Sequence, residues 1–298
     1  MVLALQIVLA ICFVGIAADL LIDINKNHKG EVKGTKKLWA QGMFVGILCN
    51  FLDTLGCGSV APSTFLYTAF NNVDDINIPG TLNVGDTFPV IFEALIFTTT
   101  VECEPIFLIA MCVAAMIGAY AFAEIITKWD VNQIRLWLGC AMLACAVLMA
   151  CKNAGIGPFG AIGDGIGFKA NQWQFWVAVL LNVLWGALMD VGFGLYAPCM
   201  ATCLLLGCSG GVCFPVFMSS CALLMPANSI VFIKKGRYDV IATLGNMIGG
   251  CIGVFIAWKI ITSLPMKVLI YLVCIVLLWT AYNILHARSV SLKEKKAA

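Results

Sequence analysis

The chain has 298 residues, of which 61% are apolar and only 11% are charged, and its formal net charge is +2. A soluble domain carries roughly 25% charged residues, so this chain has too few of them to cover a water-soluble particle. A net charge this small, with scattered basic residues, excludes a nucleic-acid partner. The composition therefore predicts a protein whose surroundings are the lipid bilayer.

Nine apolar segments have the length of transmembrane helices, since crossing a hydrocarbon core takes about 20 apolar residues. Two further apolar stretches, Val60–Phe70 and Leu195–Leu206, are too short to cross alone, so we expect each to continue a broken helix or to be re-entrant. The predicted fold is all-α, with about nine spans and the first one retained in the mature protein. The spans are Val2–Ile22, Trp39–Gly56, Phe88–Val101 (beginning near Asp86), Ile106–Thr127, Ile134–Ala150, Trp173–Val191, Val212–Ile233, Val240–Ile261 and Val268–Leu285.

The distribution of Lys and Arg predicts the orientation. With nine spans and the N-terminus outside, the cytoplasmic segments hold 14 of the 18 basic residues, as the positive-inside rule requires. Inverting the block from about residue 71 to 172 leaves this count unchanged, but it requires the short stretch Val60–Phe70 to cross. We therefore expect a multi-pass plasma-membrane protein with its N-terminus outside and its C-terminus in the cytoplasm.

Three pairs of segments recur in the same order in the two halves of the chain, at offsets of 136, 126 and 135 residues. The smaller offset reflects ten extra residues in the first half, near 71–80. This pattern predicts a tandem duplication, and it leaves open whether the repeats are parallel or inverted. The pairs are Gly56–Pro62 with Gly192–Pro198 (both GxGxxAP), Gly85–Val90 with Gly211–Val216, and Ile117–Thr127 with Ile252–Thr262.

The duplication divides the chain into five parts. We expect residues 1–37 to form an extra N-terminal transmembrane helix and a basic cytoplasmic loop. Residues 38–151 are the first repeat of about four spans, 152–172 a glycine-rich linker, 173–287 the second repeat, and 288–298 a basic cytoplasmic tail. Paired repeats with interrupted helices are typical of transporters, whose sites form where the repeats meet.

Each GxGxxAP segment has the composition of a helix break. Glycine frees backbone N–H and C=O groups from the hydrogen bonds of the helix and, without a side chain, lets a ligand approach them. Proline suits the first turn of a new helix. The freed N–H groups lie at the positive end of the helix dipole, where an anion is favoured. Close helix packing is the alternative role of such glycines, but their recurrence favours a substrate site. The residues predicted to form it are Gly56, Gly58, Ser59, Pro62, Ser63, Gly192, Gly194, Tyr196 and Pro198.

These segments resemble the TauE/SafE, or sulfite-exporter, family of permeases. So do Phe214–Ser220 (FPVFMSS) and the basic loop that follows it, Lys234–Asp239 (KKGRYD). The corresponding loop of the first half, Glu102–Pro105, departs from the family pattern because it is acidic. The resemblance covers residues from about 39 to 286. It implies transport of a small anion such as sulfite, a sulfonate, thiosulfate or a related organic acid.

Carboxylates inside apolar segments are costly and mark function by default. Asp53 and Asp190 precede the two glycine motifs, and Glu93 lies within the third span. An ionised carboxylate repels an anion, so proton coupling is a better role for these groups than direct ligation. Capping of freed backbone N–H groups is the alternative for Asp53 and Asp190. Glu93 has no such alternative, so the sequence predicts a proton-coupled secondary transporter.

Two alternatives to a transporter are compatible with the sequence, namely an anion channel and a membrane thiol-redox enzyme. The redox class rests on Cys57 and Cys199, which lie beside the two motifs, but the 15 cysteines include no CxxC pair and the two histidines lie near opposite ends. We therefore expect buried free thiols, no metal, no cofactor and no enzymatic activity. The expected partners are a small anionic solute and the bilayer, and a homodimer is left open.

Overall fold

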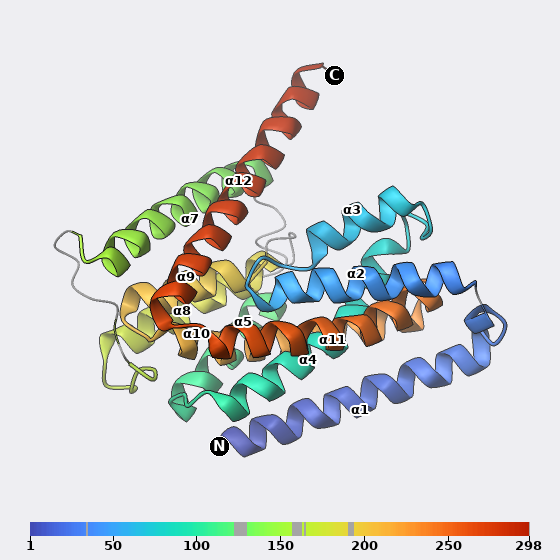
Figure 1. The fold of residues 1–298 in the computed structure, drawn as a ribbon, viewed down its shortest axis with the longest axis horizontal. Helices are drawn as coiled ribbons and strands as arrows, with labels where there is room; N and C mark the ends of the chain where they lie inside the picture. The colour runs from blue at the N-terminus through green and yellow to red at the C-terminus, as the bar shows by residue number, and fades with distance from the viewer. Residues whose placement is uncertain (34, 122–129, 157–162, 164, 190–193, 298) are drawn as a thin grey trace. The chain divides into compact units, whose positions relative to one another are not determined.

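The computed structural model describes residues 1–298 except 34, 122–129, 157–162, 164, 190–193 and 298 (Figure 1). Eleven α-helices and one short 3-10 helix, Glu31–Lys33, make up the regular structure of this described part. The α-helices are α1 (Val2–Asn27), α2 (Lys36–Thr54), α3 (Val60–Phe70), α4 (Ile78–Thr100), α5 (Pro105–Ala121), α7 (Val131–Ala154), α8 (Trp173–Met189), α9 (Tyr196–Leu206), α10 (Gly210–Lys234), α11 (Val240–Ser263) and α12 (Met266–Ala297).

Five of the described helices are long and apolar enough to cross a bilayer. The segments concerned are Val2–Asn27, Val131–Cys151, Gly210–Lys234, Val240–Ser263 and Lys267–Lys293. Two more helices, α2 and α4, have 19 and 23 residues, and buried polar side chains make them less apolar. The structure thus supports the predicted class of helical, multi-pass membrane protein.

The two short apolar stretches are helices of their own. The first, α3, coincides with the predicted Val60–Phe70, and α9 ends with the predicted stretch at Leu206. The start of the third predicted span was wrong, because α4 begins at Ile78 and not near Asp86. Its first turns contain Pro79 and Gly80, which by sequence alone favour a loop. At the chain's end, α12 continues to Ala297 through the segment predicted as a tail.

The helices form two compact units. The first unit comprises residues 1–100 and 218–263, and the second comprises residues 101–217 and 264–298. Each unit contains helices from both predicted halves of the chain. The first unit contains α1 to α4, most of α10, and α11.

In the first unit, α2 and α11 run parallel and pack through glycines. A methyl group placed on Gly46 of α2 would lie 2.6 Å from the carbonyl oxygen of Asn246 on α11, so only glycine fits there. Gly245, Gly249 and Gly253 make similarly close approaches from α11 to the backbone of α2. This contact brings the side chains of Asn50 and Asn246 together at the centre of the unit.

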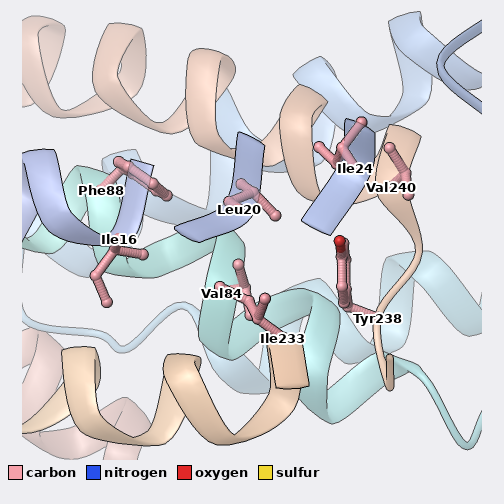
Figure 2. Close-up of a cluster of buried hydrophobic side chains, with 8 residues drawn as sticks. All are labelled: Ile16, Leu20, Ile24, Val84, Phe88, Ile233, Tyr238 and Val240. Atoms are coloured by element: carbon pink, nitrogen blue, oxygen red, sulfur yellow. The ribbon is translucent and has the colours of Figure 1, made fainter. Parts of the chain in front are cut away.

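The N-terminal helix packs on the same unit through a buried apolar cluster. Ile16, Leu20 and Ile24 of α1 lie against Val84 and Phe88 of α4 and against Ile233, Tyr238 and Val240 (Figure 2). Tyr238 points its hydroxyl toward α1 in the same view, where it donates a 2.6 Å hydrogen bond to the Asp23 carboxylate. This hydrogen bond holds the loop between α10 and α11 against α1.

The second unit has two main helix pairs, α5 with α8 and α7 with α12. The first pair also packs through glycines, because Gly118 of α5 and Gly186 of α8 leave no room for a side chain against the facing backbone. Asn182 of α8 donates a 2.7 Å hydrogen bond to the carbonyl oxygen of Met111 on α5.

Candidate functional site

The predicted helix break is present between α2 and α3. Helix α2 ends at Thr54, and α3 begins at Val60. Gly56 and Gly58 have φ values of +96° and +81°, which glycine adopts without strain. Pro62 is the third residue of α3, within the first turn, where a missing N–H costs no helical hydrogen bond. The first GxGxxAP segment therefore ends one helix and starts another.

Asp86 of α4 lies at the centre of the polar cluster beside this break, and it is 1% exposed. Its Oδ1 accepts hydrogen bonds from Asn246 Nδ2 at 2.7 Å and from Asn50 Nδ2 at 3.1 Å. Its Oδ2 accepts a 3.0 Å bond from the hydroxyl of Ser59. Three neutral donors from α2, α11 and the break thus stabilise one buried carboxylate.

Glu93 lies two turns further along α4 and is fully buried. Its Oε1 accepts a 2.6 Å hydrogen bond from the hydroxyl of Thr54, the last residue of α2. Pro89 lies between Asp86 and Glu93 inside α4. A proline there removes one hydrogen bond of the helix and faces Gly250 of α11, which accommodates the ring.

Asp53 lies in the last turn of α2 and is 5% exposed. Both the backbone N–H and the hydroxyl of Ser59 interact with its carboxylate. Ser59 is the N-cap residue of α3, and its own side chain makes no capping hydrogen bond. The Asp53 carboxylate therefore lies at the N-terminus of α3, as the capping interpretation of this residue predicts.

Ser59 links the two aspartates, because its hydroxyl meets both Asp86 and Asp53. The predicted site residues Asp53, Ser59 and Glu93 thus come together with four groups that the sequence interpretation missed. These four are Asn50, Thr54, Asp86 and Asn246. Each is a polar residue within an apolar helix, and that is the signal by which a sequence search finds them.

The other predicted residues of the first motif have different surroundings. Around Gly58, a methyl group in the Cβ position meets no atom within 4 Å, so close packing does not require glycine there. Ser63 is fully buried one turn into α3, beside the thiol of Cys49. Its hydroxyl interacts with this thiol, which is a weak hydrogen-bond partner, and with no stronger acceptor among the described residues.

The second motif lies in the second unit. Asp190 and Gly192 fall outside the described residues. Gly194 is exposed, and Tyr196 and Pro198 are buried in the first turn of α9. The ring of Tyr196 packs on that of Phe217, with 4.6 Å between the ring centres. Pro198 has the same place in α9 that Pro62 has in α3.

Four cysteines gather near α9 in the second unit, where the Cys203 thiol interacts with those of Cys199, Cys208 and Cys213. All four are free and buried. Within the described ranges, no group of His, Cys, Asp and Glu is arranged to hold a metal ion. Buried thiols of this kind behave as small apolar groups.

The chain was also compared with known proteins. It matches no family model, no curated protein and no solved structure. The geometry of the first unit is therefore the main basis for a functional proposal.

Proposed function

We propose that the protein is a membrane permease that moves a small anion and couples this movement to protons. The observation that carries the proposal is the set of three carboxylates, Asp53, Asp86 and Glu93, buried beside a broken helix in the first unit. Ionisable groups inside membrane helices are retained where they serve ion or proton pathways. Their contacts with Ser59 and Thr54 join the break to the carboxylates.

The broken helix supports an anionic substrate. An N-terminus of a helix presents free N–H groups and favours negative charge. The space around Gly58 is open to a ligand, since a Cβ there meets no atom within 4 Å. The resemblance of the motifs to the TauE/SafE permeases points to the same class of substrate, namely sulfite, a sulfonate, thiosulfate or a related organic acid.

Equivalent helix contacts support the proposed duplication. Gly253 packs on the carbonyl of Ile47 in the first unit, and Gly118 packs on the carbonyl of Val183 in the second. The two glycines are 135 residues apart and the two carbonyl residues are 136 apart. These are the offsets of the recurring sequence segments, so the pair α2 with α11 corresponds to the pair α5 with α8.

A second equivalent contact lies one turn away. Gly250 packs on Asn50, and Gly186 packs on Ala115, again at separations of 135 and 136 residues. Each half thus supplies one helix to each pair. Internal repeats with broken helices are a feature of many secondary transporters, so the proposed duplication supports this class.

The basic residues support a plasma-membrane location with the N-terminus outside and the C-terminus in the cytoplasm. Lys234 at the end of α10, and Lys235 and Arg237 in the loop that follows, are exposed, as expected of a cytoplasmic segment. We place nine crossings in this topology, with α3 and α9 as the second parts of broken helices.

Uptake into proteoliposomes tests the function. The purified chain, reconstituted with an imposed proton gradient, should accumulate at least one of radiolabelled sulfite, thiosulfate, methanesulfonate or a small dicarboxylate. Collapse of the gradient with a protonophore should abolish accumulation but leave exchange of labelled for unlabelled anion. Empty liposomes and liposomes with heat-denatured protein are the controls. Failure of all these anions to enter above the controls contradicts the proposal.

The same preparation separates the alternatives. A channel gives macroscopic currents in planar bilayers, far above the turnover of a carrier, and it cannot accumulate its anion against a gradient. A membrane enzyme consumes its substrate in detergent solution, where no second compartment exists. Gradient-driven accumulation without chemical change of the anion is the result that we expect.

A further inference from the structure

Ser59 holds an anionic group at the helix break. Its backbone N–H and its hydroxyl both meet the carboxylate of Asp53. The N-terminus of α3, where Ser59 is the N-cap residue, is the place that the proposed function assigns to the substrate anion. A carboxylate of the protein itself therefore lies where an oxyanion would bind.

Asp86 and Asp53 differ in how firmly they are held. Both oxygens of Asp86 accept hydrogen bonds, from Asn246, Asn50 and Ser59. The donors come from three separate elements, so they hold the Asp86 side chain in place. Ser59 is the residue that Asp53 and Asp86 share. A hydroxyl has a single proton, so when Ser59 donates it to Asp86 only its backbone N–H remains for Asp53.

Poorly satisfied hydrogen-bonding groups adjoin the break. Ser63, on the same face of α3 one turn after Ser59, is fully buried, and the weakly accepting thiol of Cys49 is the group that its hydroxyl meets among the described residues. The Oδ1 atom of Asn50, also fully buried, has no hydrogen-bond partner among them. Gly58, next to Ser59 in the break, leaves open space around its own Cα. A buried hydroxyl held only by a thiol is poorly satisfied, so its presence points to a ligand with a stronger acceptor.

We propose that the Asp53 carboxylate occupies the anion site at the N-terminus of α3 in the resting protein, and that its protonation exchanges it for the transported anion. This inference rests on the proposed function. One proton enters with each anion and stays on the Asp53 oxygen, so the net charge of the site is unchanged by a monovalent anion and becomes one unit more negative with a divalent one. The anion takes over the Ser59 N–H and gains the Ser63 hydroxyl. The neutral Asp53 then offers an O–H donor in place of a repelling charge.

Several other titratable groups face this site from the surrounding elements. Asp53 differs from these groups in its contact with the backbone N–H of Ser59. They are Cys49 of α2, Cys57 of the break, Tyr67 of α3, Asp86 and Glu93 of α4, and Cys251 of α11.

Anion binding to the purified full-length protein in detergent tests this exchange. Thiosulfate and methanesulfonate are suitable probes because neither titrates near neutral pH. Linkage of one proton to one anion should weaken wild-type binding by about tenfold for each pH unit above the titration of Asp53. Asp53→Asn should bind the anion with a dissociation constant that changes by less than about twofold over the same range. Asp75→Asn, the same change at an exposed aspartate, is the matched control and should keep the wild-type slope.

A second measurement needs no variant. In unbuffered solution with a pH-indicator dye, the wild-type protein should take up about one proton for each anion bound. Proton uptake close to zero, or an Asp53→Asn protein with the wild-type pH slope, overturns the exchange even if transport is intact. If the wild type neither binds nor transports any anion tested, the proposed function itself has failed.

Discussion

The Asn246 amide of α11 donates a 2.7 Å hydrogen bond to the Asp86 carboxylate of α4, and both side chains are buried. The two residues are 160 positions apart in the chain. Glycine allows their contact, since a Cβ on Gly85 would lie 2.8 Å from the amide nitrogen of Asn246. The bond thus links α11 to α4, the helix that carries both Asp86 and Glu93.

Removal of this amide should destabilise the first unit. Asn246→Ala leaves a buried carboxylate short of one donor, which typically costs about 1–3 kcal/mol. Thermal unfolding of the purified protein in detergent should show a clear fall in Tm. Asn171→Ala, at an exposed asparagine, is the control and should leave Tm unchanged. Equal Tm values for both variants would show that Asp86 does not depend on the Asn246 donor.

Glu93 is the expected site of gradient coupling. Glu93→Gln keeps an oxygen that accepts the 2.6 Å hydrogen bond from Thr54 but cannot carry a proton on and off. Proton-driven accumulation in proteoliposomes should be lost, while exchange of internal for external anion continues. Glu102→Gln, the same change at an exposed position, should behave as the wild type. Accumulation that persists in Glu93→Gln at several pH values would make Glu93 a structural group.

Asp239 should contribute to the pH dependence of stability. It precedes α11, where its Oδ1 accepts a 2.8 Å bond from the N–H of Ala242 and its own N–H donates to Thr81. Burial raises the pKa of Asp239, so the folded state favours the protonated form. Its contribution to stability is therefore present at low pH and lost as pH rises through the raised pKa.

Two variants distinguish the effect of the Asp239 capping hydrogen bond on stability from the effect of its charge. Asp239→Asn keeps a capping oxygen and removes the titration, so the Tm of this variant should exceed that of the wild type by a margin that grows with pH. Asp239→Ala loses the cap and should be less stable than Asp239→Asn by about 1 kcal/mol. Parallel Tm curves for the wild type and Asp239→Asn would show that Asp239 does not titrate in this range.

Reactivity of single cysteines should report the orientation. On a cysteine-free background, a cysteine at Lys235, in the exposed loop before α11, should resist a membrane-impermeant maleimide in intact cells. A cysteine at Lys267, exposed at the start of α12, should react. Both should react after the cells are opened, which controls for local accessibility. Labelling of the Lys235 position in intact cells would reverse the proposed topology.

The features that depend on short runs of sequence could be predicted. The bounds of α3 follow from a mainly apolar stretch of eleven residues between two groups of turn residues, and Glu93 is identifiable because a lone carboxylate stands out in an apolar run. The environment of Asp86 could not be predicted, since its donors Asn50 and Asn246 lie 36 and 160 residues away and meet it only through packing. The start of α4 was missed for the same reason, because Gly80 fits closely against the backbone of Arg237.

The two glycine motifs provide the last prediction. At Gly58 and Gly194, a Cβ meets no atom within 4 Å, so neither glycine is required for packing. They differ in conformation, because Gly58 has a φ of +81° while Gly194 is not among the glycines of positive φ. Gly58→Ala should therefore cost about 1–2 kcal/mol from backbone strain, whereas Gly194→Ala should cost almost nothing.

Valine at these positions tests the substrate site. A larger side chain at Gly58, which adjoins Ser59, or at the corresponding Gly194 of the second motif should raise the apparent Km for the anion strongly, or eliminate transport, while the protein still inserts and purifies as a single species. Gly46→Val is the contrasting control, because a Cβ there lies 2.6 Å from the carbonyl oxygen of Asn246 and folded protein should be lost. Loss of transport without loss of folded protein is thus expected for Gly58→Val and Gly194→Val alone. A monodisperse Gly58→Val protein that binds thiosulfate as tightly as the wild type would exclude the break between α2 and α3 as the anion site.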